Sequence, residues 1–346
     1  MNKEYILNII KKIEHPGNFD LTEKIEFIHV SEQKVKIIVN SEFTSGTEKL
    51  THLWQSMIEK DNKITSCSVI YTRHRTPNLK QNMPSKNQQF LNKFDLSHLG
   101  KILFIASGKG GVGKSTISSN IAVQIAEMGF KVGLMDADIY GPSQPKMLGL
   151  NNSKVEIKNK KIIPKKIGNL SMMSMGMLFP EHEAIVWRGP MLMKGIQQLL
   201  LDVAWDNQDF FIVDLPPGTG DIHITLAQKV IVSGAIVIST PQDISLIDAK
   251  KAIALYQKTN TKILGLIENM SYFECSKCGE KHNIFSNGGV EKITNVENLP
   301  HLGSIPLSKN IMECAENGTP YSSNNPDGET IFSEIVKNIF KELNSF

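Results

Sequence analysis

The sequence has few cysteines, little net charge and no long apolar segment. Four cysteines among 346 residues are too few for a disulfide framework. A net charge of +3 is too small to predict binding to nucleic acid or to a membrane surface. No run of about 18 apolar residues occurs, so no segment is predicted to span a bilayer. The opening "MNKEYILNIIKKIEH" mixes charged with apolar residues, unlike a secretory signal. These absences favour a reduced, cytoplasmic protein.

Changes in composition divide the chain into three parts. Residues 1–75 are predicted to form a small α+β domain, in which two helical segments, "EYILNIIKKI" and Thr47–Lys60, accompany the β-rich runs "KIEFIHV", "KVKIIVN" and "KITSCSVIY". Residues 76–100 are polar, rich in Asn, Gln, Lys and Pro, and without periodicity, which predicts a linker. Residues 101–346 then form a larger domain.

The larger domain is predicted to have an α/β fold with a mostly parallel sheet. Its apolar runs alternate with helical stretches such as Ser115–Met128 and Ile244–Lys258. Fully apolar strands that alternate with helices are typical of a parallel sheet covered by helices on both faces. The predicted strands are "KILFIAS", "KVGLMDA", "DFFIVDLPP", "GAIVIST" and "TKILGLIEN".

A phosphate-binding loop lies between the first of these strands and the helix that follows it. Gly108, Gly113, Lys114 and Ser115 match G-x-x-x-x-G-K-[ST] in the strand–helix context that supports the motif. Glycines let backbone N–H groups turn toward phosphate oxygens, and the helix N-terminus adds its positive dipole. We expect Lys114 to contact the β- and γ-phosphates of ATP and the Ser115 hydroxyl to bind Mg²⁺. The predicted nucleotide-binding residues of the loop are Gly108, Lys109, Gly110, Gly111, Val112, Gly113, Lys114, Ser115 and Thr116.

The loop carries a second lysine, Lys109, ahead of Lys114. The segment "GKGGVGKST" resembles the deviant Walker A loop of the class that contains the nitrogenase iron protein, MinD and ParA. In that class the early lysine reaches across a nucleotide-sandwich dimer to the phosphates of the partner subunit. The resemblance therefore implies a homodimer in which Lys109 stabilises the charge that develops on the transferred phosphoryl group.

The same resemblance assigns roles to residues near the ends of the predicted strands. It makes Asp138 in "DADIYGPS" the switch I residue that orients the attacking water, so the implied catalytic residues are Lys109, Lys114 and Asp138. It places Asp214 in "DLPPGTGD" at the Walker B position, where it holds the Mg²⁺ shell. Asn269 in "IENMSYF" would read the adenine, with Pro306 in "GSIPLS" packed beside it. Nucleotides bind at the carboxyl edge of such sheets, where the predicted strand ends lie.

Cys275 and Cys278 form a C-x₂-C turn in "ECSKCGEKH", a spacing that lets two thiolates face one metal ion. Two ligands do not complete a tetrahedral site, and three completions are open. His282 and another residue would finish a zinc site within the chain, or the pair would form a redox disulfide. Alternatively, two subunits would each give two cysteines to one bridging metal centre. The third completion fits the dimer that the early lysine implies. The other cysteines, Cys67 and Cys314, lie in apolar or helical surroundings and are predicted to be structural.

Taken together, the motifs resemble the Mrp/ApbC family of iron–sulfur cluster carrier ATPases. The resemblance rests on "GKGGVGKST", "DADIYGPS", "WRGPM", "DLPPGTGD", "ENMSYFEC" and the C-x₂-C, and it covers residues 101–346. It implies a homodimer that binds and slowly hydrolyses ATP and holds a bridging 4Fe–4S cluster at Cys275 and Cys278. It also implies that the protein works with a cluster-assembly scaffold and passes the cluster to apo iron–sulfur proteins.

Residues 1–75 more faintly resemble the small iron–sulfur assembly domain that often precedes this ATPase. That domain normally carries a Thr-x-x-Cys-Pro-type turn, and the corresponding stretch "NSEFTSGTEKL" has neither cysteine nor proline. A docking module without a metal or thiol role is the resulting interpretation.

Two alternative functions use the same phosphate loop. A MinD- or ParA-like positioning ATPase needs a membrane helix or a basic DNA surface. The predicted C-terminal helix, Thr330–Leu343, has no basic polar face, because Lys337 and Lys341 are balanced by Glu334 and Glu342. The modest net charge likewise does not suggest a DNA surface. A zinc-bound, nucleotide-dependent regulator is the other alternative.

Overall fold

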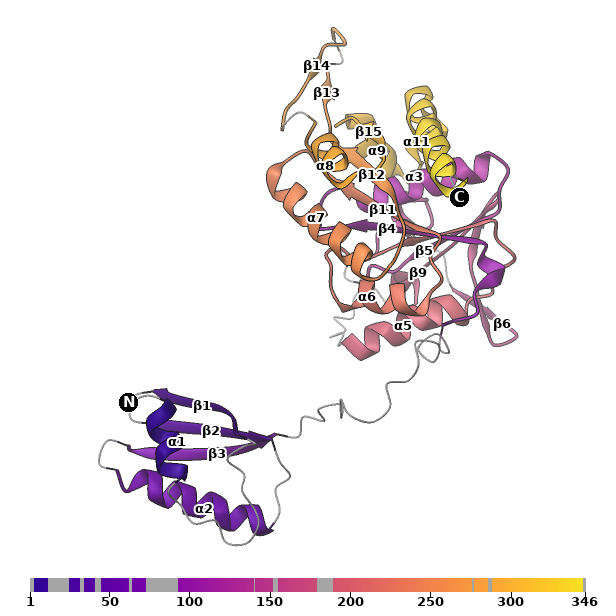
Figure 1. Cartoon of the computed structure of the whole chain (residues 1–346). Helices are drawn as coiled ribbons and strands as arrows, with labels where there is room; N and C mark the ends of the chain where they lie inside the picture. Colours follow the sequence, from indigo (N-terminus) through magenta and orange to yellow (C-terminus); the bar gives the residue numbers. More distant parts are fainter. Residues whose placement is uncertain are drawn as a thin grey trace. The chain divides into compact units, whose positions relative to one another are not determined.

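The computed structural model describes residues 3–11, 25–31, 34–40, 45–61, 64–72, 93–139, 141–151, 155–178, 189–275, 277–285 and 288–344. The chain divides into two compact units, Met1–Lys86 and Asn87–Phe346 (Figure 1). The domain boundaries expected at residues 75 and 100 stay a prediction, because most of the expected linker lies outside the described residues.

The first unit is a small α+β fold. Its described strands form a sheet of order β1-β2-β3, with β1 antiparallel and β3 parallel to β2. Apolar residues of the helices and the sheet share one core that includes Ile6, Ile37 and Trp54. Cys67 is buried in this core, and burial, with the charge of Glu59, raises the pKa of its thiol to about 11. The elements are α1 (Lys3–Lys11), β1 (Ile25–Ser31), β2 (Lys34–Asn40), α2 (Ser45–Glu59) and β3 (Ser66–Thr72).

Every helix and strand predicted in this unit is present, and the structural role predicted for Cys67 agrees with its burial. Within the stretch compared with the Thr-x-x-Cys-Pro pattern, "NSEFTSGTEKL", residues 41–44 lie outside the described residues.

The second unit is built on an eight-stranded sheet, as far as the chain is described, with strand order β15-β12-β11-β4-β10-β5-β9-β8. Neighbouring strands are parallel except β8, which runs antiparallel to β9. The strands are β4 (Lys101–Ser107), β5 (Val132–Asp136), β8 (Lys165–Ile167), β9 (Leu170–Ser174), β10 (Phe210–Asp214), β11 (Gly234–Ser239), β12 (Ile263–Asn269) and β15 (His301–Ile305). Two small hairpins lie outside this sheet, β6 (Glu156–Lys158) with β7 (Lys161–Ile163) and β13 (Phe273–Glu274) with β14 (Lys281–His282).

Helices cover both faces of this sheet, and each face has its own core. Side chains of a strand point alternately to the two faces, so Leu103 and Ile105 of β4 join one core while Phe104 joins the other. The first core is covered by α3 (Lys114–Glu127), α10 (Tyr321–Asn324) and α11 (Pro326–Asn344), and the second by α5 (Gly189–Leu201), α6 (Asp221–Lys229), α7 (Asp243–Lys258) and α8 (Gly289–Glu297). The described residues also include the helices α4 (Gln144–Met147) and α9 (Lys309–Asn317) and the short 3₁₀ turns Ser97–Leu99 and Met175–Met177.

The predicted α/β fold with a mostly parallel, helix-covered sheet is confirmed. The five predicted strands of the large sheet are all present, but β8, β9 and β15 were not predicted. Met172 and Met173 of β9 are fully buried, so the methionines of that segment are packing residues. None of the helices described has the length and apolar composition needed to cross a membrane.

Candidate functional site

The carboxyl ends of β4, β5, β10 and β12 bring the predicted nucleotide residues to one edge of the sheet. A cavity of about 210 Å³ lies there. Asp138 follows β5, and Asp214 and Asn269 are the last residues of β10 and β12. The cavity is lined by Ser107, Lys109, Gly110, Gly111, Val112, Gly113, Lys114, Ser115, Thr116, Asp138, Ser143, Met147 and Pro217.

Glycine is required at Gly113 for two reasons. Its φ of +83° lies in the left-handed region, and a Cβ added there would lie 2.2 Å from the Asn269 amide nitrogen. Gly113 is also the N-cap of α3, so the loop delivers the positive end of the helix dipole to the cavity. The chain is therefore shaped to accept an anion such as a triphosphate at this point.

Lys114 and Asp214 form a buried ion pair beneath the loop. The Lys114 Nζ lies 2.5 Å from Asp214 Oδ1, and both side chains are nearly inaccessible to solvent. Asp214 also accepts hydrogen bonds from Ser118 Oγ, at 2.9 Å, and from Gln144 Nε2, at 2.8 Å. These donors contact both carboxylate oxygens and hold the Asp214 side chain in place beneath the loop. Its part in the shell around a Mg²⁺ ion stays a prediction.

A second buried carboxylate, Asp136, is the register partner of Asp214 on the neighbouring strand. Burial, followed by the nearby charge of Asp214, raises its pKa to about 7. Ser174 Oγ donates to Asp136 Oδ2 at 2.9 Å, and the Gln144 backbone N–H donates to the same oxygen at 3.3 Å. Gln144 thus joins both carboxylates, and its side chain also donates to the Ser115 carbonyl at 2.9 Å.

Lys109, Ser115 and Asp138 face the same cavity. Among the described residues, no carboxylate forms an ion pair with the Lys109 ammonium. The Lys114 ammonium, in contrast, is paired with Asp214. The Ser115 hydroxyl accepts a hydrogen bond from Lys114 Nζ at 3.3 Å, and Asp138 Oδ1 accepts one from the Gly141 N–H at 3.3 Å. The three side chains therefore lie where a phosphate chain and its metal ion would be contacted.

Asn269 is the last residue of β12, and Pro306 directly follows the neighbouring strand β15. Asn269 pairs in register with Ile305, the residue before Pro306. The Asn269 Nδ2 donates to the Val112 carbonyl at 2.8 Å, so this side chain holds the phosphate loop. A contact of either residue with adenine remains a prediction.

His223 fixes the loop that follows Asp214. Its Nε2 lies 2.9 Å from the Pro216 carbonyl, which can only accept, so the proton is on Nε2 and Nδ1 accepts from the Tyr256 hydroxyl at 3.0 Å. Burial lowers the pKa of His223 to about 4, which keeps the ring neutral. This residue was not predicted from the sequence, since a single histidine in a helix carries no signal of its contacts.

The two predicted metal ligands lie in the turn of the β13–β14 hairpin, which projects from the second unit (Figure 1). The Cys275 N–H donates to the Glu280 carbonyl at 2.9 Å, and the Gly279 N–H donates to the Cys275 carbonyl at 2.8 Å. Backbone N–H groups of Lys277 and Cys278 lower the pKa of the Cys275 thiol. Cys278 is exposed and Cys275 is partly exposed.

His282 lies on β14, opposite Phe273 in the hairpin register, and its Nε2 is 3.8 Å from Glu280 Oε2. In the described segments, no group of three or more His, Cys, Asp or Glu side chains is arranged to hold a metal ion. The hairpin of one chain thus presents two thiols, which is half of a four-thiolate site.

Comparison with known proteins identifies the family. Residues 98–344 match the sequence model described as ParA, NUBPL iron-transfer P-loop NTPase. This chain belongs to that family.

Relatives of this iron-transfer P-loop NTPase share much of its length. A protein of Helicobacter pylori called "Iron-sulfur cluster carrier protein" is 34% identical over 353 aligned residues, which cover 100% of this chain and 93% of the relative. A protein of the same name from Haemophilus influenzae is 37% identical, covering 98% of this chain and 86% of its own length.

Solved structures agree with the fold of this family member. A nucleotide-binding protein from Archaeoglobus fulgidus in complex with ADP has a TM-score of 0.60 and 34% identity, covering 68% of this chain and 93% of that one. The cell division ATPase MinD of Pyrococcus furiosus has a TM-score of 0.54 at 24% identity, covering 70% of this chain and 99% of its own, and shows the shared fold.

Replacing Asn269 with alanine in this P-loop NTPase is expected to weaken ATP binding about tenfold, because the Val112 carbonyl loses its donor and the loop loses its support. Calorimetric titration with ATP measures the effect. Asn338→Ala is the matched control, since Asn338 also donates to a backbone carbonyl, that of Leu302, but outside the loop. Equal ATP affinities of the Asn269 and Asn338 variants would contradict the role given to Asn269.

Proposed function

We propose that this protein is an ATP-binding and ATP-hydrolysing iron–sulfur cluster carrier. It holds a 4Fe–4S cluster between two copies of the chain and transfers it to apoproteins. The observation that carries the proposal is the exposed Cys275–Cys278 turn on a projecting hairpin, in the same unit as a complete phosphate loop. The names of the relatives from Helicobacter pylori and Haemophilus influenzae support it.

The need for four thiolates supports a bridging cluster. Such a cluster takes four cysteine ligands, and each hairpin offers Cys275 and Cys278. The lowered pKa of Cys275 favours the thiolate, which is the form that binds iron. Both thiols are accessible to solvent, so a second copy can approach them. Two hairpins related by a twofold axis would supply all four ligands.

The exposed apolar side chains near the two thiols are consistent with a dimer in which they are covered. Phe273, Ile284 and Phe285 are 36%, 55% and 44% exposed, which places large apolar side chains beside the cysteine turn. Lys281 lies over the Tyr272 ring, 4.6 Å from its centroid. Covering these apolar side chains with those of a second hairpin would stabilise the dimer and limit solvent access to the cluster.

The nucleotide site also fits a dimer. Ile244 and Ile247, at the start of α7, are 69% and 57% exposed. This helix lies against the loop, because a Cβ added to Gly108 would be 2.2 Å from backbone atoms of Asp248. An apolar surface thus flanks the loop that carries Lys109, and a second copy covering it would receive that lysine.

Several residues around the loop then have a role in hydrolysis. Lys114 and the loop backbone bind the phosphates; Ser115 and Asp214 would hold a Mg²⁺ ion, which would neutralise phosphate charge. Asp138 orients the water that attacks the γ-phosphorus while the bond to the bridging oxygen of ADP breaks. Lys109 of the partner copy stabilises the negative charge of that transition state. The nucleotide state changes the geometry of the two subunits and so the exposure of the cluster to an acceptor, and an assembly scaffold reloads the thiols.

Anaerobic reconstitution with iron and sulfide, followed by absorbance spectroscopy, tests the proposed cargo. A broad absorbance band that disappears when the cluster moves to an apoprotein is expected. A colourless protein that retains zinc under the same conditions would contradict the carrier function and favour a zinc-bound regulator.

Replacing Lys109 with alanine is expected to lower the ATP turnover rate by about 100-fold or more while ATP affinity changes less than about threefold, because its contact forms only in the closed dimer. Steady-state hydrolysis and ATP titration separate the two effects. Lys309→Ala, which removes an exposed lysine paired with Glu313 on α9, is the control. Equal losses of affinity and turnover in the Lys109 variant would mean that Lys109 binds the nucleotide of its own subunit.

A further inference from the structure

A second cavity, of about 580 Å³, lies at the end of α3 that is remote from the phosphate loop. It is bounded by that helix end, by Leu148 after α4, by the β8–β9 turn and by the segment that joins α9 to α10. It shares no lining residue with the phosphate-loop cavity. Its volume lies in the range of pockets that bind small organic molecules.

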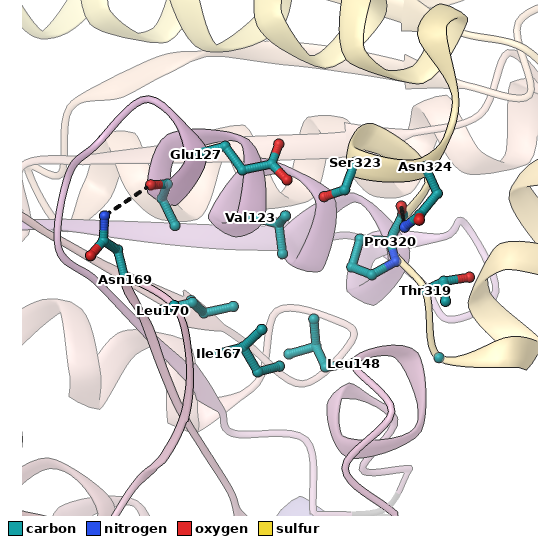
Figure 2. A pocket seen from close by; sticks show the side chains of 13 residues that line it. Val123, Glu127, Leu148, Ile167, Asn169, Leu170, Thr319, Pro320, Ser323 and Asn324 are labelled. Atoms are coloured by element: carbon teal, nitrogen blue, oxygen red, sulfur yellow. Dashed lines mark hydrogen bonds between the residues drawn. The ribbon is translucent and has the colours of Figure 1, made fainter.

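The lining combines apolar side chains with one acidic group. Figure 2 shows Leu148, Ile167 and Leu170 along one side of the cavity, and across from them Glu127, Val123, Ser323 and Pro320. Leu148 and Leu170 are buried, and Ile167 is 40% exposed. An occupant with a short hydrocarbon part and a polar end would place the hydrocarbon along the apolar side chains and the polar end toward Glu127.

The charge of the cavity has one sign. Glu127 is the only charged side chain among the described residues that line it. The cavity also meets the C-terminal ends of two helices, α3 at Glu127 and α9 at Gly318, where backbone carbonyls give a partial negative charge. Two lysines lie close in sequence to lining residues, but neither is paired with Glu127. Lys146 forms an ion pair with Glu316, and Lys166 forms one with Asp206.

We propose that this cavity binds an aliphatic cation, an ammonium or guanidinium group on a short hydrocarbon chain, and that its occupancy is coupled to the nucleotide site. The hydrocarbon chain lies along Leu148, Ile167 and Leu170, and the cation faces Glu127 and the two helix ends. The same chemistry is available as a free amine or guanidine and as a lysine or arginine side chain of a partner protein.

Two hydrogen-bonded links connect the cavity to the phosphate loop. The Leu148 N–H donates to the Gln144 carbonyl at 3.1 Å, and the Gln144 side chain donates to Asp214 Oδ2 and to the Ser115 carbonyl. On the other side, the backbone N–H of Ser322 donates to Asn120 Oδ1 at 2.7 Å, and Asn120 Nδ2 donates to the Thr116 carbonyl at 2.7 Å.

A ligand that moves Leu148 or the Ser322 segment would therefore change the conformation of the phosphate loop. By reciprocity, ATP must change the affinity for the cation by the same factor as the cation changes the affinity for ATP.

Calorimetric titration of the full chain with butylguanidinium tests the binding site, with butylurea as the neutral molecule of the same shape. Glu127 is exposed, so we expect Glu127→Gln to weaken butylguanidinium binding about fivefold, the upper end for an exposed ion pair, and to leave any butylurea binding unchanged. Glu334→Gln, on the exposed side of α11, is the matched control and should bind like the unmodified chain. Equal binding of butylguanidinium and butylurea, or an unchanged Glu127→Gln variant, would overturn the site.

The source of the cation and the coupling need two further measurements. A capped Gly-Arg-Gly peptide, compared with its citrulline counterpart, represents a partner side chain, and tighter binding of the arginine peptide than of butylguanidinium would assign the cavity to a protein partner. The reverse order would assign it to a free small cation.

Saturating butylguanidinium is expected to change the ATP dissociation constant about fivefold. An ATP affinity that is the same with and without it would overturn the coupling.

Discussion

Replacing Lys114 with alanine is expected to reduce ATP hydrolysis by about 100-fold or more, because the variant loses the cation that we expect to contact the β- and γ-phosphates. The variant also leaves Asp214 buried without its ion-pair partner, beside the second buried carboxylate of Asp136. Removing one partner of such a pair destabilises a fold by about 3 kcal/mol or more. Steady-state hydrolysis and thermal unfolding measure the two losses together.

The two losses can be separated with a second variant. Lys114→Gln keeps a hydrogen-bond donor within reach of Asp214 but removes the positive charge, so it should retain more stability than the alanine variant while still failing to hydrolyse ATP. Lys251→Ala removes an exposed lysine that pairs with Asp248 on α7, and it should leave both quantities unchanged. A folded Lys114→Gln protein with normal turnover would contradict the role of this loop in binding ATP.

Replacing Cys275 or Cys278 with alanine is expected to abolish stable cluster binding. Each chain offers one suitably spaced pair, so the loss of either thiol in a dimer removes two of four ligands at once. ATP affinity should change little, because no residue of the β13–β14 hairpin lines the phosphate-loop cavity. Iron and sulfide analysis after reconstitution, together with ATP titration, measures the two outcomes.

Cys314→Ala is the matched control for this pair. Cys314 lies on α9, is partly buried and packs against the core that α3, α10 and α11 cover. Its loss should therefore leave the cluster content unchanged. The dimer that forms on cluster binding should be lost with the Cys278→Ala variant and kept with the Cys314→Ala variant. Wild-type iron and sulfide in Cys278→Ala would show that the bridging site is wrong and that Cys67, Cys314 or His282 is a ligand.

Strands that are continuous apolar runs could be predicted from the sequence, and strands that contain several polar residues, such as β8, β9 and β15, could not. β4, β10 and β11 are continuous apolar runs, and short runs of this kind between helices are typical of buried parallel strands. β8 and β15 are edge strands, and an edge strand needs less apolar surface. Lys165 and Lys166 fill most of β8, and Gly303 and Ser304 interrupt β15, so neither segment has a strand pattern.

The site was predicted to the extent that its residues lie in one motif. Gly110, Gly111, Gly113, Lys109, Lys114 and Ser115 belong to one local loop, and the structure places them around one cavity, whereas Gly108 packs against Asp248 of α7 and does not line it. The bonds of Gln144 to Asp214 and to Asp136 join segments that meet only when the sheet has formed. No local pattern marks a glutamine for such a role, so these contacts require the folded chain.

The claim that a cluster bridges two chains is tested most directly by native mass spectrometry of the anaerobically reconstituted full chain. We predict a mass equal to two chains plus one 4Fe–4S cluster, and single chains when the cluster is removed with a chelator. Single chains that each retain a whole cluster, or a dimer whose mass includes zinc and no sulfide, would contradict the bridging cluster.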